Sequence, residues 1–200
     1  MHDRDLCYLA SPNLHSMTPL LSLLPPTMDP STLALLANLQ TRLRHLEDLE
    51  ALRTLINTYA SACDAGDIAL FTTTFAADSV LAAAWFGEIR GRDAIGQGVA
   101  SARNWGRLMH SISNVQVEIT GEGRATGTAY LSFYAVKDRK ELGRNYVFGG
   151  PYYFTFERLE GEGEEGGKRG WRVRRLEIER WWEQGADETG AFGGDSRGDN

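Results

Sequence analysis

The sequence has little cysteine and no long hydrophobic run. These two absences exclude disulfide-rich, zinc-binding and membrane-spanning proteins. Only Cys7 and Cys63 occur in 200 residues, too few for a disulfide framework, and their spacing is not that of a zinc site. No apolar stretch approaches the ~20 residues that a membrane-spanning helix requires. We therefore predict a cytoplasmic protein, in a reducing compartment, that does not interact with membranes.

Excess basic charge is also missing. The formal net charge is −6, and phosphate binding needs a basic surface, so nucleic acid is excluded as a main partner. "GRDAIG" from Gly91 lacks the lysine and spacing of a phosphate-binding loop, and no His, Cys or carboxylate cluster has metal-ligand spacing. The sequence therefore predicts neither a metal nor a cofactor.

Composition divides the chain into four parts. "MTPLLSLLPPT", from Met17, is apolar but contains three prolines, and the residues before it lack the basic region of a signal peptide. Gly, Asp and Glu dominate the C-terminal end. We predict a disordered leader (1–27, with Met28 a candidate start), a helical extension (28–45), one domain (46–184) and a disordered tail (185–200).

Leucines at helical spacing precede a series of long strands. From Leu36 to Ile56 they predict either one helix or two with a break near Asp48, ending at Gly66. A short helix capped by Asp67, a hairpin over 78–91 and a third helix over 91–105 follow. Four long strands are then expected, over 108–120, 124–136, 144–159 and 171–182. Early helices and late antiparallel strands indicate an α+β fold, in which a strongly curved sheet wraps the helices around a central pocket.

In the stretch "RLMHSISNVQVEI", the inward side chains are predicted at even-numbered positions in the first half and at odd-numbered positions in the second. Leu108, His110 and Ile112 alternate on one parity, whereas the apolar residues from Val115 alternate on the other. A strand that changes parity has passed a bulge, here near Asn114. The pattern therefore turns His110 inward, among apolar side chains.

Several segments resemble the SnoaL-like family of alpha-beta cones, in the nuclear-transport-factor-two-like superfamily. They are "LEDLEALRTLINTYASACDAGDIALFTTTFAADSVL", "GEIRGRDAI", "MHSISNVQVEITGEGRATGTAYLSFY" and "GGPYYFTFERL…GWRVRRLEIERWW". The resemblance covers about 46–182. Relatives include scytalone dehydratase, lindane dehydrochlorinase and polyketide cyclases, so the resemblance implies the cone fold and a set of related chemistries.

The resemblance also implies a pair of chemical groups. In the dehydratase and dehydrochlorinase members, an Asp at the end of the first helix pairs with a His on the third strand, which correspond here to Asp64 and His110. Other polar groups of those enzymes have no equivalent, because their positions hold Cys63, Ala135 and Leu176. The dehydratase's own reaction is therefore not assigned.

A carboxylate on one imidazole nitrogen orients the ring and leaves the other nitrogen as a general base. This predicts a cofactor-independent lyase or isomerase, of dehydratase or cyclase type, acting on a small hydrophobic cyclic molecule, as in secondary metabolism. His110 would be the base and Asp64 its partner. The alternative is a cone that binds a ligand or a partner chain without catalysis, in which Asp64 serves a turn and His110 is a core residue.

Further side chains are candidates for the pocket or for contacts between subunits. A polar-aromatic face with Tyr130 either lines the hollow or meets a second subunit, and the sequence predicts a homo-oligomer, a dimer or trimer. The leucines of 33–46 pack either on their own domain or on a neighbour. The candidate substrate-binding residues, each alternatively plain core or a structural residue, are Tyr59, Trp85, Asn114, Tyr134, Tyr146 and Phe148.

Overall fold

The computed structural model describes residues 29–100, 104–138, 140–159 and 170–192. The chain divides into two units, one ending at Leu43 and the other beginning at Arg44. The predicted leader and residues 193–200 of the predicted tail lie outside the described residues. No helix in the described ranges is long and apolar enough to cross a membrane.

Helix α1 (Pro30–Ala65) is continuous, so the alternative of two helices with a break near Asp48 is wrong. Its N-terminus is capped by Asp29, whose carboxylate accepts the backbone N–H groups of Ser31 (2.9 Å) and Thr32 (3.1 Å). The part up to Leu43 forms the described portion of the first unit.

Gly66 ends α1 in the left-handed region, at φ 69°, and its N–H donates to the Cys63 carbonyl. Helix α2 (Ile68–Thr73) starts at once, because the Asp67 carboxylate accepts the Leu70 N–H at 2.9 Å. This confirms the predicted caps. The strand after α2 begins earlier than predicted, at residue 75 instead of 78.

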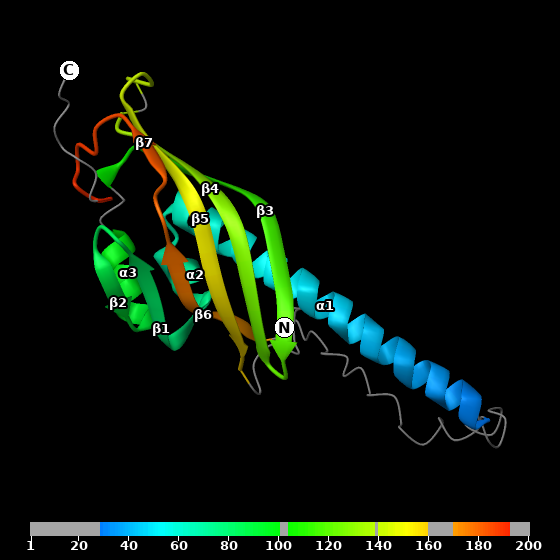
Figure 1. Cartoon of the computed structure of the whole chain (residues 1–200). Helices are drawn as coiled ribbons and strands as arrows, with labels where there is room; N and C mark the ends of the chain where they lie inside the picture. Colours follow the sequence, from blue (N-terminus) through cyan, green and yellow to red (C-terminus); the bar gives the residue numbers. More distant parts are fainter. Residues whose placement is uncertain (1–28, 101–103, 139, 160–169, 193–200) are drawn as a thin grey trace, which may run out of the picture. The chain divides into compact units, whose positions relative to one another are not determined.

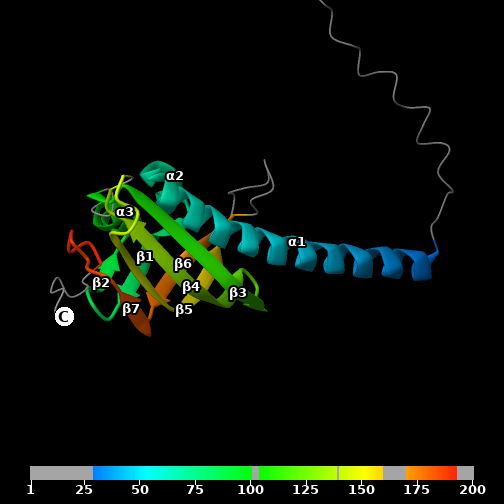
Figure 2. The ribbon, with the colours of Figure 1, turned by 90° about the horizontal axis from the view of Figure 1, so that it is seen from above.

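The second unit contains one curved, open sheet, shown in Figures 1 and 2. Its order is β2-β1-β6-β5-β4-β3, and β7 pairs with β5. Helix α3 packs on α2 and β1. The elements are β1 (Phe75–Ala83), β2 (Gly87–Arg90), α3 (Arg92–Ala100), β3 (Arg107–Gly121), β4 (Arg124–Val136), β5 (Asn145–Arg158), β6 (Trp171–Ile178) and β7 (Trp182–Gln184).

Two details of the sheet differ from the prediction. The sheet is mixed, because β1 runs parallel to β6. The last predicted strand, 171–182, is two strands, since residues 179–181 form a bulge between β6 and β7, which pair with the same edge of β5. There Trp181 donates its N–H to Gly149 at 2.8 Å, and a Cβ at Gly150 would overlap the Glu179 carbonyl. Only glycine at position 150 permits this close approach of the two backbones.

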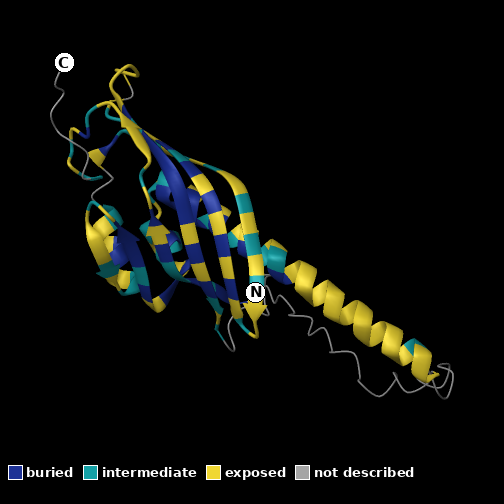
Figure 3. Ribbon diagram, in the orientation of Figure 1, coloured by how far each residue is buried: buried dark blue, intermediate teal, exposed yellow. Residues whose placement is uncertain are grey.

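The predicted bulge in β3 is confirmed. Ser113 pairs with Tyr130 but Gln116 pairs with Thr128, so β3 carries one extra residue. Asn114, inside the bulge, has a φ of 51°, a left-handed conformation that Asn tolerates. The bulge bends the strand. Figure 3 shows buried and exposed residues alternating along the adjacent strand, β4.

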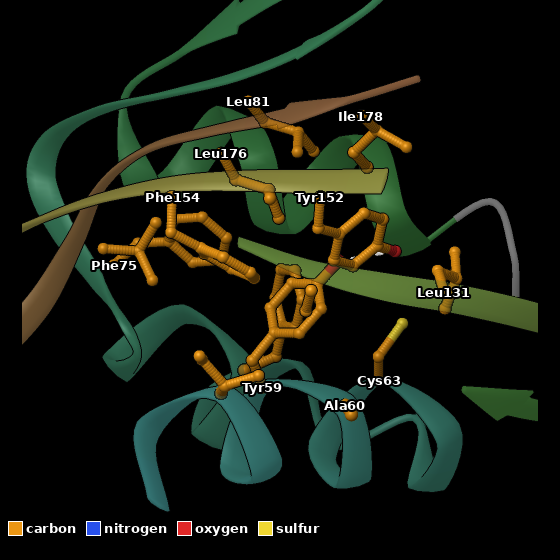
Figure 4. Close-up of a cluster of buried hydrophobic side chains, with 14 of the residues drawn as sticks. Tyr59, Ala60, Cys63, Phe75, Leu81, Leu131, Tyr152, Phe154, Leu176 and Ile178 are labelled. Carbon is orange, nitrogen blue, oxygen red and sulfur yellow. Dashed lines mark hydrogen bonds between the residues drawn. The ribbon is translucent and has the colours of Figure 1, made fainter. Parts of the chain in front are cut away.

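The core lies between the concave face of the sheet and the part of α1 after Arg44. From the helix, Leu52, Ile56 and Tyr59 are at most 4% exposed. Figure 4 shows Tyr59 and Cys63 of the helix directed at side chains from the strands above them. The strands contribute mainly aromatic rings, including Phe133, Phe148, Tyr152, Phe154 and Phe156. Any group that points inward is therefore surrounded by apolar rings.

Candidate active site

A cavity of about 190 Å³ lies inside the cone. Its lining is apolar except for His110, Cys63 and two tyrosine hydroxyls, and no carboxylate occurs among the described residues that line it. Ligand pockets have this character, with few polar groups in a mostly apolar wall. The aromatic part of the wall consists of Tyr59, Trp85, Phe86, Phe133, Phe148, Tyr152 and Phe192.

His110 and Asp64 meet beside this cavity, 46 residues apart in the sequence. The His110 Nδ1 lies 2.5 Å from the Asp64 Oδ1. The His110 backbone N–H also donates to both carboxylate oxygens, at 3.1 and 2.9 Å. These contacts hold the carboxylate by one residue's main chain and side chain together.

The arrangement defines the roles of the two imidazole nitrogens. A carboxylate accepts hydrogen bonds, so Nδ1 carries the proton and Nε2 has a free lone pair. Among the described residues Nε2 has no hydrogen-bond partner, and the His110 side chain, 6% exposed, lines the cavity. The Phe133 ring at 4.8 Å and the Tyr59 ring at 5.9 Å fix the imidazole edge-on. Nε2 is therefore the nitrogen available to a ligand.

The local sequence explains how each partner reaches the site. Asp64 is in the last turn of α1, two residues before the glycine that ends the helix, so its side chain projects from the helix end. The Asp64 side chain is 24% exposed and borders a second depression of about 410 Å³. His110 is near the start of β3, on the inward parity that the sequence predicts. The carboxylate thus has access to water while the imidazole faces the apolar cavity.

Two tyrosine hydroxyls form a second polar group in the cavity. Tyr59 of α1 and Tyr152 of β5 approach within 3.5 Å, oxygen to oxygen. Burial raises the pKa of Tyr59 well above its usual range, and burial likewise raises the pKa of Tyr152. Both hydroxyls therefore stay protonated at neutral pH, and the one that does not donate to the other can donate to a ligand oxygen.

Sequence reasoning identified Tyr59 but missed Tyr152. Tyr146, Phe148 and Phe154 all face inward on β5, and strand residues two apart share a face. Continuing that alternation from Phe148 would have selected Tyr152, which is 1% exposed.

Cys63 lines the cavity but is not prepared for nucleophilic chemistry. Burial, and next the nearby Asp64 carboxylate, raise the pKa of the Cys63 thiol to about 12. The thiolate is the reactive form of cysteine, and at neutral pH it is nearly absent here. In the described part of the chain, no three His, Cys, Asp or Glu side chains converge as in a metal site.

The prediction of a disordered tail from residue 185 is wrong for residues 185–192. The Asp187 carboxylate, fully buried, accepts the Phe192 N–H at 2.7 Å, and Arg180 donates to the Phe192 carbonyl at 3.2 Å. The Phe192 ring lies 4.8 Å from that of Phe133 and stacks on Tyr146 at 5.9 Å. The Gly- and Asp-rich composition of the C-terminal end predicted disorder, and Phe192 was therefore not recognised as part of the cavity wall.

Replacing Phe192 with alanine is expected to enlarge the cavity and admit larger ligands, because the ring is part of the wall. We expect 1-aminoanthracene, a three-ring fluorescent probe, to bind the variant about tenfold more tightly than the original protein, a change of about 1.4 kcal/mol. Fluorescence titration measures this. Leu142→Ala, at a residue 69% exposed, is the control, and equal probe affinity in all three proteins would contradict the role of Phe192.

The structure brings together some of the predicted substrate-binding residues. Tyr59, Trp85 and Phe148 line the cavity with His110. Tyr146 lies behind the wall instead. Its hydroxyl donates to the Glu183 carboxylate at 2.5 Å and accepts from Arg180 at 2.7 Å, and burial, followed by the bond to Glu183, raises its pKa.

Two of the predicted substrate-binding residues face away from the cavity. Tyr134 is 39% exposed, because its neighbour Phe133 points inward and successive strand residues point to opposite faces. Asn114 is exposed in the β3 bulge and is not part of the cavity lining. We remove both from the candidate site.

A larger depression, about 840 Å³, lies at the β3–β4 turn and the adjoining strand ends. Two of the three arginines that line it, Arg158 and Arg174, are already engaged by carboxylates. Arg158 pairs with Asp48, and Arg174 pairs with Asp78 and Glu157. We therefore place the site at the smaller cavity, where a poised acid–base pair meets an apolar space.

Solved structures share this fold. A hexachlorocyclohexane dehydrochlorinase, LinA-type3 from Novosphingobium barchaimii LL02, has a TM-score of 0.59 at 14% identity, covering 72% of this chain and 92% of its own. A scytalone dehydratase-like protein from Novosphingobium aromaticivorans DSM 12444 has a TM-score of 0.60 at 17% identity, covering 70% and 88%. An NTF2-like protein with a cystatin-like fold, also from Novosphingobium aromaticivorans, has 0.59 at 26% identity, covering 73% and 90%.

None of the curated proteins matches the sequence. The model of the SnoaL-like domain matches residues 44–177, which include Asp64, His110 and both tyrosines of the cavity. This range also begins where the second structural unit begins, at Arg44. Over two thirds of its length, therefore, the chain is a SnoaL-like domain, and it belongs to the SnoaL-like family of the NTF2-like superfamily.

Proposed function

We propose that this protein is a cofactor-independent lyase or isomerase, of dehydratase or cyclase type, in which His110 is the general base. The observation that carries the proposal is the 2.5 Å contact of the His110 Nδ1 with Asp64, which leaves Nε2 at an apolar cavity. Relatives of the same fold named as a dehydrochlorinase and as dehydratase-like support lyase-type chemistry.

The chemistry begins with a C–H bond next to a carbonyl or a leaving group. Nε2 accepts that proton, and the Asp64 carboxylate stabilises the imidazolium that forms. The protonated Tyr59 hydroxyl donates a hydrogen bond to the oxygen on which negative charge develops. The imidazolium then returns its proton to the departing group or to another ring atom, which completes an elimination or an isomerisation without a cofactor. General acid–base catalysis of this kind contributes roughly 10²–10⁴ in rate.

The size of the cavity limits the substrate. A dry cavity of roughly 150 Å³ is enough to hold benzene, so about 190 Å³ accommodates one six-membered ring with small substituents. Two fused rings would need Phe192 or Trp85 to move. We therefore propose a hydrophobic, single-ring substrate, such as a cyclic compound with a carbonyl or halogen substituent.

Proton exchange tests the proposal without knowledge of the natural substrate. Cyclohexanone and 2-cyclohexenone in D₂O are incubated with the protein, and loss of the α-proton signal is followed by NMR. We expect exchange above the buffer rate with the original protein and none with His110→Gln. Ligand-induced shifts without exchange would favour the alternative, a binding cone without catalysis. Equal exchange by both proteins would remove His110 from its role.

Removing the Tyr59 hydroxyl is expected to weaken the reaction moderately. Tyr59→Phe keeps the ring contacts but deletes one hydrogen bond to the substrate oxygen, worth about 1.5 kcal/mol or roughly tenfold in kcat/KM. The same exchange assay measures it, with Tyr153→Phe, at an exposed position, as control. A Tyr59→Phe protein with unchanged kcat/KM would show that the substrate oxygen lies elsewhere.

A further inference from the structure

Helix α1 carries a row of exposed leucines that the site does not use. Leu36, Leu39, Leu43 and Leu46 are 43%, 47%, 56% and 62% exposed. Figure 3 shows the N-terminal part of α1 exposed almost throughout. Single exposed leucines are normal on protein surfaces, but a contiguous row marks an interaction surface.

The spacing of the row is specific. The four leucines, here called the leucine stripe, follow one another at intervals of three, four and three residues. These are the a and d positions of two heptads, the pattern by which helices pack side by side along a narrow seam. Leu33 and Leu35, 52% and 59% exposed, lie at the flanking e and g positions just before the stripe and add apolar surface beside the seam.

Leu46, the last residue of the leucine stripe, is not part of the helix face that packs in the core. Leu46 is 62% exposed, whereas Asp48, two residues later, is 6% exposed. Residues two apart on a helix point about 200° from each other. The Leu46 side chain therefore lies on the side of the helix opposite Asp48 and faces away from the domain core.

We propose that the leucine stripe pairs with the same stripe of a second copy of this chain, as a parallel, in-register, two-stranded coiled coil. With Leu36 at position a, Arg42 is at position g and Glu47 at position e, and both are exposed. A parallel pairing places g of one helix beside the following e of the other, so Arg42 faces Glu47 of the second copy, twice by symmetry. An antiparallel pairing sets g against g and does not bring these charges together.

The helix is already formed where the stripe ends. Short isolated helices are marginal in water because starting a helix is unfavourable. Here the residues of α1 from Asp48 onward are packed in the domain core, and they supply the nucleus from which the helix extends toward its N-terminus. The two leucine heptads can therefore associate without the unfavourable step of starting a helix.

The mass of the assembly in solution tests the proposal. The full chain is compared with Leu39→Glu/Leu43→Glu and with a matched control, Asn38→Glu/Thr41→Glu, which places the same charges on positions c and f. We expect sedimentation equilibrium to give the control the dissociation constant of the original protein and to give the leucine variant one at least about 100-fold higher. Unchanged circular dichroism and melting of the domain show that the variant is folded.

Equal association of all three proteins would overturn the proposal. That result is expected if residues 1–27 of the same chain cover the leucines, or if copies associate only through other surfaces. Any association through the cone itself is common to the three proteins, so the difference between the variants isolates the leucine stripe.

A disulfide cross-link tests the parallel register. Leu39→Cys in a Cys7→Ser background places one thiol at a central d position. In the proposed dimer, this thiol lies opposite the thiol at the same position of the second copy. We expect oxidation to yield a covalent dimer, whereas Thr41→Cys, on the outer face, stays monomeric on a denaturing gel. Absence of a cross-linked dimer with Leu39→Cys would overturn the parallel arrangement.

Discussion

Replacing His110 with glutamine is expected to lower kcat/KM for the proton-transfer reaction by about 10²–10⁴, because glutamine cannot accept a proton at neutral pH. Glutamine keeps a polar group of similar size that can still contact Asp64, so the wall of the cavity survives. The loss therefore reports the missing base and not a collapsed site.

The measurement is single-substrate kinetics by NMR exchange or product formation. His45→Gln is the matched control, since His45 is exposed on α1 and away from the cavity lining, and its activity should equal that of the original protein. A His110→Gln protein within twofold of full activity would exclude the proposed mechanism.

Asp64→Asn extends the same test to the orienting group. Asp64 accepts hydrogen bonds through both oxygens, whereas an amide offers one acceptor and one donor. When the amide nitrogen faces Nδ1, the imidazole takes the other tautomer and Nε2 loses its lone pair. We expect the double variant Asp64→Asn/His110→Gln to have a kcat/KM no lower than that of the lower single variant, because the two residues act as a unit. Additive losses would show that they act independently.

Asp48→Ala is expected to lower the free energy of unfolding by about 3 kcal/mol. The Asp48 carboxylate, buried on α1, accepts the Trp171 Nε1–H at 3.1 Å and forms an ion pair with Arg158, whose guanidinium lies 4.6 Å from the Trp171 ring. A hydrogen bond to a charged group contributes about 1.5–3 kcal/mol, and breaking a buried ion pair costs about 3–5 kcal/mol. The Arg158 side chain is 35% exposed and regains water, so we expect the lower part of that range.

Urea unfolding at neutral pH measures this change. Glu50→Ala, on the exposed side of the same helix, is the control and should lie within about 0.5 kcal/mol of the original protein. Asp48→Asn, which keeps an acceptor for Trp171, should fall between the two. Equal stability of Asp48→Ala and Glu50→Ala would show that the contacts of Asp48 with Trp171 and Arg158 do not hold α1 to the sheet.

Local patterns predicted most of the helices and strands and part of the site, and the cone fold was implied by the family resemblance. Leucine periodicity predicted α1, the Asp67 cap predicted α2, and the change of parity in β3 predicted both the bulge and the inward position of His110. Each of these depends on neighbours within a few residues, which is the range over which backbone geometry repeats. The split between β6 and β7 escaped prediction because its cause, contact with Gly149 and Gly150 of β5, lies on another strand.

By itself the sequence determined that His110 enters the interior, because strand and helix periods assign a face to each residue, but it did not exclude Tyr134 and Asn114 from the site, although both face away from the cavity. Which side chains meet is decided by the tertiary structure, and for one pair, Asp64 and His110, the resemblance to the SnoaL-like family already implied the contact. Asp64 contacts His110 across 46 residues and Tyr59 contacts Tyr152 across 93, distances along the chain over which no local period carries information. The same reason explains Phe192, whose place in the cavity wall depends on hydrogen bonds to Asp187 and Arg180 and on aromatic rings from distant strands.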